Sequence, residues 1–230
     1  MMRQSFLEAD KAYEAQLHDY ALSDSVKAII LYGIIFALFY GLGRIEAVKG
    51  RYYGVPVCGA IILVMFFLHR HHLSRIGATR HRLKQSLIAG SALGVLFLSA
   101  GVIIRSLQSH GPLLPFPEIL HDVFYYFVIV GLFEEIVMRG FIQPRLFPLL
   151  KREWLVTLLA GILFALWHLP FPMALRGMSL QEYWPVFRSG MLSLILYHYL
   201  HTWLYRRYGN IFGPALLHGM IDLGFHSLLG

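Results

Sequence analysis

Two adjacent carboxylates followed closely by an arginine are the first residues whose types and spacing suggest chemistry. Glu134, Glu135 and Arg139 lie within the otherwise apolar stretch Gly131–Gly140. Glu135 precedes Arg139 by four residues, which is the favourable order for an ion pair along a helix. Glu134 lacks this partner and points about 100° away around the helix, towards a different space. The spacing therefore predicts a Glu135–Arg139 ion pair and leaves Glu134 as the candidate general base.

Two histidine motifs with helical spacing come later in the chain. Phe164 and His168 are four residues apart, as are His218 and Asp222, so each pair shares one face of a predicted helix. A carboxylate one turn from an imidazole can fix its tautomer or bind the same ligand. A glutamate and histidines, without a serine or cysteine in comparable positions, suit the activation of water. Hydrolysis is therefore the predicted reaction class.

Each of these groups has a natural role in hydrolysis. Glu134 would take a proton from water, His168 would hold or polarise that water, and His218 would donate a hydrogen bond to the oxyanion. The same Glu134, His168 and His218 could instead bind zinc as a two-histidine, one-carboxylate set with an open position for water. The sequence leaves the cofactor open, and we favour the metal-free scheme.

Other ionisable residues admit simpler interpretations. His198 and His201 are three residues apart and could bind a metal, but histidine also suits a membrane interface, which is the interpretation that we favour. Glu118 and Asp122, near the start of the fourth apolar run, are interpreted as solvated at the outer surface.

Equal distances from a turn suggest that the motifs lie at equal depth. Glu134 lies 17 residues before the basic turn Lys151-Arg152, and His168 lies 16 residues after it. In an antiparallel helical hairpin, residues equally far from the bend have the same depth. His218 lies 11 residues beyond the next basic turn, at Arg207. We therefore expect the motifs to meet in one buried cavity.

The composition places the chain in a membrane. Of its 230 residues, 57% are hydrophobic and 14% are charged, whereas soluble domains contain about 25% charged residues. The single cysteine, Cys58, excludes a disulfide framework and a cysteine-based zinc site. The net charge of +7 comes from basic residues between apolar runs, so we expect no nucleic-acid partner.

Seven apolar runs predict an all-α, polytopic membrane bundle, with the active site in a cavity between the last four helices. The runs are Ala28–Gly43, Tyr53–Leu68, Leu87–Ile104, Val123–Phe141, Trp154–Leu169, Val186–Leu204 and Ile211–Leu229. The N-terminal segment and the loops after the second, fourth and sixth runs hold 13 Lys and Arg, and the other loops hold 5, while Arg139 and Arg188 lie inside the fourth and sixth runs. The positive-inside rule therefore predicts a cytoplasmic N-terminus in a multi-pass protein of the cell membrane.

These runs also predict the domain organisation. Residues 1–27 carry five acids among spaced apolar positions, which indicates an amphipathic interfacial segment and not a cleavable signal peptide. Residues 28–117 form three N-terminal transmembrane helices, and residues 118–230 form the catalytic core.

Taken together, the motifs resemble the three signature motifs of the CPBP family, which groups type II CAAX prenyl endopeptidases with bacteriocin-processing and immunity proteins. They are Glu134-Glu135-x-x-x-Arg139, Phe164-x-x-x-His168 and His218-x-x-x-Asp222, in that order in successive predicted helices. The resemblance covers about Phe124 to Leu229. It implies an all-helical intramembrane protease in which the first glutamate and the first histidine handle water and the last pair serves the oxyanion. The family is often called a metalloprotease group, although a metal-free glutamate mechanism has been argued for its prenyl-protein members.

One residue departs from the family pattern, because Asp222 stands where the last motif often has asparagine. An ionised aspartate cannot donate a hydrogen bond to an oxyanion. Asp222 must therefore be protonated, orient His218, or help to hold a metal.

Three function hypotheses of different classes follow. The favoured one is an intramembrane endopeptidase that hydrolyses a peptide bond of a membrane-associated protein or peptide, possibly lipidated, among membrane lipids. A second is a non-catalytic immunity or scaffold protein, in which the polar residues hold helices together. The third is a proton-coupled transporter, for which the sequence offers neither repeats nor broken helices.

Overall fold

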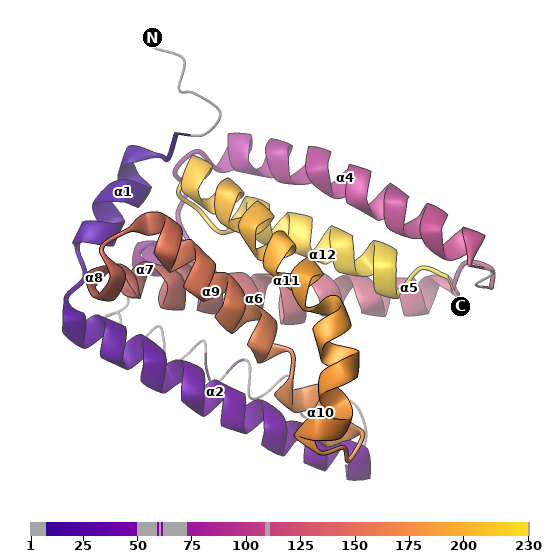
Figure 1. Ribbon diagram of the computed structural model, residues 1–230. Coiled ribbons are helices and arrows are strands. Elements are labelled where there is room, and N and C mark those ends of the chain that lie inside the picture. The colour runs from indigo at the N-terminus through magenta and orange to yellow at the C-terminus, as the bar shows by residue number, and fades with distance from the viewer. Residues whose placement is uncertain (1–7, 50–58, 60, 62–72, 109–110, 230) are drawn as a thin grey trace. The chain divides into compact units, whose positions relative to one another are not determined.

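The computed structural model describes residues 8–49, 59, 61, 73–108 and 111–229, and their regular structure is helical (Figure 1). The chain divides into two compact units. Unit 1 comprises residues 1–14, 73–140 and 203–230, and unit 2 comprises residues 15–72 and 141–202. The predicted all-α fold is confirmed for the described residues. The two units alternate along the sequence, because each is built from segments that the other interrupts.

Unit 1 is built around the C-terminal helix α12, Phe212–His226. This helix packs against α4, Leu83–Leu107, and against the π-helical segment η2, Tyr125–Leu132, which continues α5, Phe116–Phe124 (Figure 1). Glycines bring the backbones close together. A Cβ on Gly101 of α4 would lie 2.6 Å from the carbonyl carbon of Gly224 in α12. Such small-residue contacts are a common way for membrane helices to associate, and here they fix the helix that carries His218.

One end of unit 1 joins three segments that the basic-residue count assigns to the cytoplasm. The Asp10 carboxylate lies 3.0 Å from Nε2 of His81 and 3.1 Å from a guanidinium nitrogen of Arg82, and the Asp10 amide donates to the carbonyl of Arg206. Burial alone would raise the pKa of Asp10, but hydrogen bonds from His81, the Ala12 amide and Arg82 together hold this pKa below its usual value.

The other end of unit 1 joins the segments predicted to lie outside. The guanidinium of Arg105 donates to the carbonyls of Phe225 and Leu229, and the Ser227 hydroxyl donates to Asp122. Each end of unit 1 thus joins segments that the basic-residue count assigns to the same side of the membrane, and the side itself stays a prediction.

A direct test of the topology uses reporter fusions. Because the basic residues outside the runs divide 13 to 5 between the two sets of segments, fusions in the Gly77 loop and at the C-terminus should report opposite sides of the membrane. Alkaline phosphatase and fluorescent-protein fusions at both positions measure this. The same side for both positions would mean that the predicted span count is wrong.

Unit 2 contains three longer helices: α2 (Leu22–Lys49), α9 (Glu153–Trp167) and the part of α11 (Leu180–Tyr208) that ends at Thr202. Three short helices complete it: α7 (Gln143–Arg145), α8 (Phe147–Leu150) and α10 (Pro170–Leu175). Helix α2 packs against α10, and α9 packs against α7 and α8. Its core includes the buried side chains of Ala165, Leu169, Tyr183 and Phe187.

The described residues support a multi-pass membrane protein, but they do not confirm seven spans. Four helices are long and apolar enough to cross a membrane, and they contain the first, third, fourth and fifth predicted runs: Leu22–Ile45, Leu83–Leu107, Phe116–Leu150 and Glu153–Leu175. The predicted second span, Tyr53–Leu68, lies almost entirely outside the described residues. Helices also form at the sixth and seventh predicted runs. Helix α11 is too polar to count as a membrane span by its mean hydropathy, and α12, with 15 residues, is too short.

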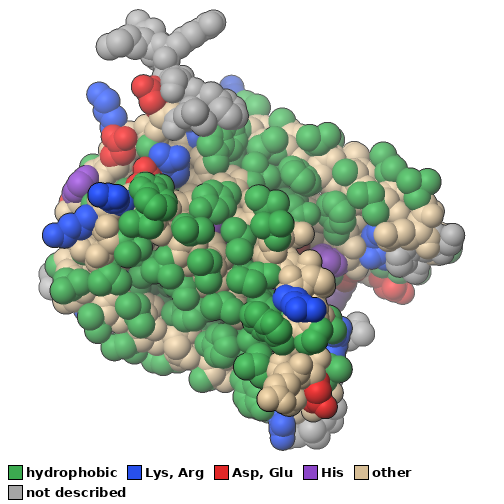
Figure 2. Space-filling model, in the orientation of Figure 1, with side chains coloured by type: hydrophobic (Ala, Val, Ile, Leu, Met, Phe, Trp, Pro, Cys, Tyr) green, Lys and Arg blue, Asp and Glu red, His purple; other side chains and the backbone are tan. Residues whose placement is uncertain are grey.

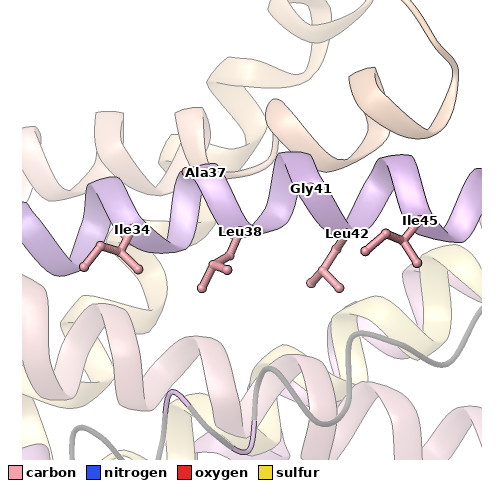
Figure 3. A pocket seen from close by; sticks show the side chains of 6 residues that line it. All are labelled: Ile34, Ala37, Leu38, Gly41, Leu42 and Ile45. Carbon is pink, nitrogen blue, oxygen red and sulfur yellow. The ribbon is translucent and has the colours of Figure 1, made fainter.

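The surface agrees with a lipid environment. Figure 2 shows hydrophobic side chains over most of the face that it presents, with most charged side chains towards the edges. Ile29, Ile30 and Ile34 of α2 are each more than half exposed. The same helix carries an open groove lined by Ile34, Ala37, Leu38, Gly41, Leu42 and Ile45 (Figure 3). This groove has no ionisable lining residue, so it offers no group for acid–base chemistry.

Candidate active site

The predicted ion pair between Glu135 and Arg139 is present. Oε1 of Glu135 lies 3.0 Å from a terminal guanidinium nitrogen of Arg139, and both side chains are fully buried. A charge pair without access to water is held together strongly, and each partner is costly to leave alone. The pair therefore stabilises the helical turn that follows Glu134, because both partners belong to the same helical stretch.

π-Helical turns lie on both sides of the two glutamates. The segment η2 ends at Leu132, α6 covers Phe133–Glu135, and the π-helical segment η3 covers Ile136–Ile142. A π-helical turn re-aims the residues that follow it relative to an α-helix, and such turns are frequent at functional sites. The sequence carries no local signal for these π-helical turns, so α-helical spacing does not predict them.

The His218 imidazole stands between three carboxylates. Its Nδ1 lies 2.9 Å from Oε1 of Glu135, and its Nε2 lies 3.8 Å from Oε2 of Glu134 and 3.5 Å from Oδ2 of Asp222. The expectation that Glu134 faces a different space from Glu135 is therefore wrong. Both acids approach the same ring at different nitrogens, because the π-helical turns and the packing of α12 bring them together.

The same geometry assigns hydrogen-bonding roles to the ring. An ionised carboxylate only accepts hydrogen bonds, so Nδ1 of His218 is the donor in its hydrogen bond to Glu135. Nε2 lies at ion-pair distances from Asp222 and Glu134. A ring protonated at both nitrogens offers Nε2–H as a charge-assisted donor, which is the stronger kind of hydrogen-bond donor.

Asp222 occupies the partly exposed side of this cluster. Its side chain is 18% exposed, whereas that of Glu135 is fully buried. Asp222 and His218 share one face of α12, as their spacing predicts, and the Asp222 carboxylate lies closest to the nitrogen that faces Glu134. Of the roles left open for Asp222, orientation of His218 fits this contact best.

His168 lies in unit 2, at the C-terminal end of α9. Its Nδ1 is 2.8 Å from the carbonyl oxygen of Phe164, and the two rings make an edge-to-face contact at 4.8 Å. Because a carbonyl oxygen only accepts, Nδ1 carries the proton and the neutral ring accepts through Nε2. The predicted Phe164–His168 motif thus fixes one tautomer of a half-buried histidine.

His198 and His201 are buried, with exposed fractions of 0% and 1%. They therefore do not face the membrane surface from the outside of a helix, and their position relative to the membrane interface stays a prediction. The ring of Phe164 in α9 packs against His198. Glu118 is exposed as expected, while Asp122 accepts the Ser227 hydroxyl and is only partly exposed.

Of the six predicted site residues, the structure gathers five within unit 1: Glu134, Glu135, Arg139, His218 and Asp222. The arrangement pairs a nearly buried carboxylate with an imidazole that donates hydrogen bonds, which suits acid–base hydrolysis. Two ligands of one zinc ion lie at most about 4.2 Å apart, twice a typical ligand distance. The Glu134–His218 contact of 3.8 Å meets that limit, so these two residues fit a zinc site.

Residues 116–224 match a family model described as Type II CAAX prenyl endopeptidase Rce1-like. The matched segment begins with α5, contains all three motifs, and ends two residues after Asp222. Searches of curated proteins and of solved structures found no match to the chain.

Proposed function

We propose that the protein is an intramembrane endopeptidase that uses an activated water, because residues 116–224 match the model of the Rce1-like type II CAAX prenyl endopeptidases. The observation that carries this proposal is the His218 ring, buried between Glu134, Glu135 and Asp222. A buried imidazole whose Nε2–H faces a candidate base is arranged to stabilise negative charge beside the attacking water.

The proposed reaction uses the groups as their hydrogen bonding suggests. The attacking water donates a hydrogen bond to Glu134, and its oxygen attacks the carbonyl carbon of the scissile bond. The role that this proposal gives to His168, acceptance of a hydrogen bond from water through Nε2, rests on its motif and its tautomer alone. Glu134 takes the water proton as the C–O bond forms. Nε2–H of His218 donates to the oxyanion, and Glu134 then returns the proton to the leaving amine as the C–N bond breaks.

Asp222 supports this scheme without donating a hydrogen bond. An ionised Asp222 beside Nε2 of His218 favours the doubly protonated ring, which is the better donor to an oxyanion. In this proposal Asp222 does not donate to the oxyanion as an asparagine could. It acts by making Nε2–H of His218 a stronger donor.

The alternatives explain fewer contacts. Helix association in a non-catalytic protein requires the Glu135–Arg139 pair but not Glu134 and Asp222 beside one imidazole. Three carboxylates around His218 are costly for packing alone, whereas an enzyme uses them to set protonation.

The proposed substrate is a peptide or protein segment at the membrane, with a prenylated C-terminus as the preferred form. We expect purified protein in liposomes to cleave a farnesylated peptide with a cysteine-aliphatic-aliphatic-X ending at least about ten-fold faster than the unmodified peptide. The reason is that a lipid chain concentrates the peptide in the bilayer. Mass spectrometry of the released C-terminal fragment measures both rates. Equal rates would exclude recognition through the lipid, and cleavage of neither peptide would contradict the CAAX substrate class.

A second experiment separates the metal-free scheme from a zinc-dependent one. If zinc were bound, Glu134 and His218 would hold it, with His168 as the third ligand that the motifs suggest, and it would supply a more acidic water. We expect activity to survive o-phenanthroline as it survives a non-chelating isomer, and Asp222→Asn to keep turnover within about ten-fold, since the loss of one charged hydrogen-bond partner changes a rate by this order. One zinc per chain by elemental analysis, with activity lost on chelation and restored by zinc, would overturn the metal-free scheme.

A further inference from the structure

A chain of buried polar side chains lies beside α9 in unit 2. Gln143, His198 and Thr202 are each at most 1% exposed. The Thr202 hydroxyl donates to Oε1 of Gln143 at 3.1 Å and lies 3.2 Å from Nε2 of His198. Because the single hydroxyl proton of Thr202 points to Gln143, Nε2–H of His198 must donate to the Thr202 oxygen. The His198 ring is therefore fixed in orientation and in tautomer.

The fixed His198 ring packs on the helix that carries His168. Its centroid lies 5.6 Å from that of the Phe164 ring, at an interplanar angle of 41°. Gly161, one turn earlier in α9, makes room for it, because a Cβ at Gly161 would lie 3.3 Å from Cδ2 of His198. Gly161 and Phe164 are three residues apart and so present one face of α9 to His198.

Phe164 links the two histidines. One histidine, His198, contacts its ring, while the other, His168, contacts both its ring and its carbonyl oxygen. We propose that His198 is a positioning residue that, through Phe164, holds the His168 ring in one orientation and one tautomer, with Nε2 as its hydrogen-bond acceptor. This inference rests on the proposed function of His168. Groups that orient a catalytic histidine without touching the substrate commonly affect the reaction rate strongly, because a small misplacement of a reacting group raises the activation barrier.

Kinetic variants test the linkage. His198→Ala should lower kcat at least about ten-fold and leave KM within about two-fold, because misplacing the water-holding ring affects the transition state and not ground-state binding. Thr202→Val removes the hydroxyl at nearly constant shape and should lower kcat about five-fold, whereas Thr202→Ser keeps the hydroxyl and should stay within about two-fold. If His198→Ala fails to fold, the Thr202 pair decides the question.

Two further variants serve as control and as a coupling test. Tyr32→Phe removes a different hydrogen bond to α9, from the Tyr32 hydroxyl to the Leu163 carbonyl, and should leave kcat within about two-fold. In a Phe164→Leu background, His198→Ala should have little additional effect, because the proposed linkage runs through the Phe164 ring.

Nuclear magnetic resonance gives a readout that does not need a substrate. In protein labelled with ¹⁵N-histidine, the signal lost in His168→Gln identifies His168, and its Nδ1 should carry the proton. His198→Ala and Gly161→Ala should shift this signal towards a mixture of tautomers, while Thr202→Ser should leave it unchanged.

The outcomes separate this inference from the proposed function. If the wild-type protein cleaves no peptide, the proposed function fails, and the resonance shift still decides whether His198 positions His168. If cleavage depends on Glu134 but His198→Ala and Thr202→Val change neither kcat nor the His168 signal, the positioning role is overturned.

Discussion

Replacing Glu134 by glutamine is expected to lower the rate of peptide cleavage by about 10²–10⁴-fold, the range in which a general base contributes to catalysis. The amide keeps the shape of the side chain but cannot take a proton from water. The amide also keeps a hydrogen-bond acceptor at the same position, so the melting temperature should change little. The initial rate on the farnesylated peptide and the melting temperature in detergent measure the two effects separately.

A matched control for this variant is Glu118→Gln. Glu118 belongs to the same unit, lies in α5 and is exposed, so its neutralisation should change neither the rate nor the melting temperature. Normal turnover by purified Glu134→Gln protein would remove Glu134 from the role of base. A large fall in melting temperature would instead show that Glu134 holds the fold together.

Replacement of Arg139 by alanine is expected to have the largest effect on stability. The guanidinium and the Glu135 carboxylate are both fully buried and 3.0 Å apart. Removing one partner of a buried pair leaves the other charge without compensation, at a cost of about 3–5 kcal/mol. Folded yield and resistance to chemical denaturation should therefore fall sharply, and activity should fall with them.

Two comparisons make this result specific. Arg152→Ala removes an exposed arginine before α9 and should leave stability nearly unchanged. The double variant Glu135→Gln with Arg139→Gln removes both charges and should recover part of the lost stability. If Arg139→Ala were as stable as the wild-type protein, the buried pair would not be a structural anchor.

The sequence by itself determined the features that depend on local geometry and on composition. A membrane protein built of helices follows from the apolar runs and from the cost of burying backbone polar groups in lipid. The Glu135–Arg139 pair follows from a spacing of four residues, and so does the contact between Phe164 and His168. The order of the three motifs also indicated the CPBP family, and the family-model match to residues 116–224 supports that prediction.

The tertiary structure alone decided the features that depend on distant residues. His218 lies 83 residues from Glu135, and no local rule predicts that its two nitrogens face different glutamates. That arrangement requires π-helical turns around the glutamates and glycine contacts that place α12 close to α4. The burial of His198 likewise depends on packing against Phe164. Helical periodicity fixes which residues share a face, but the packing of helices far apart in sequence determines what that face meets.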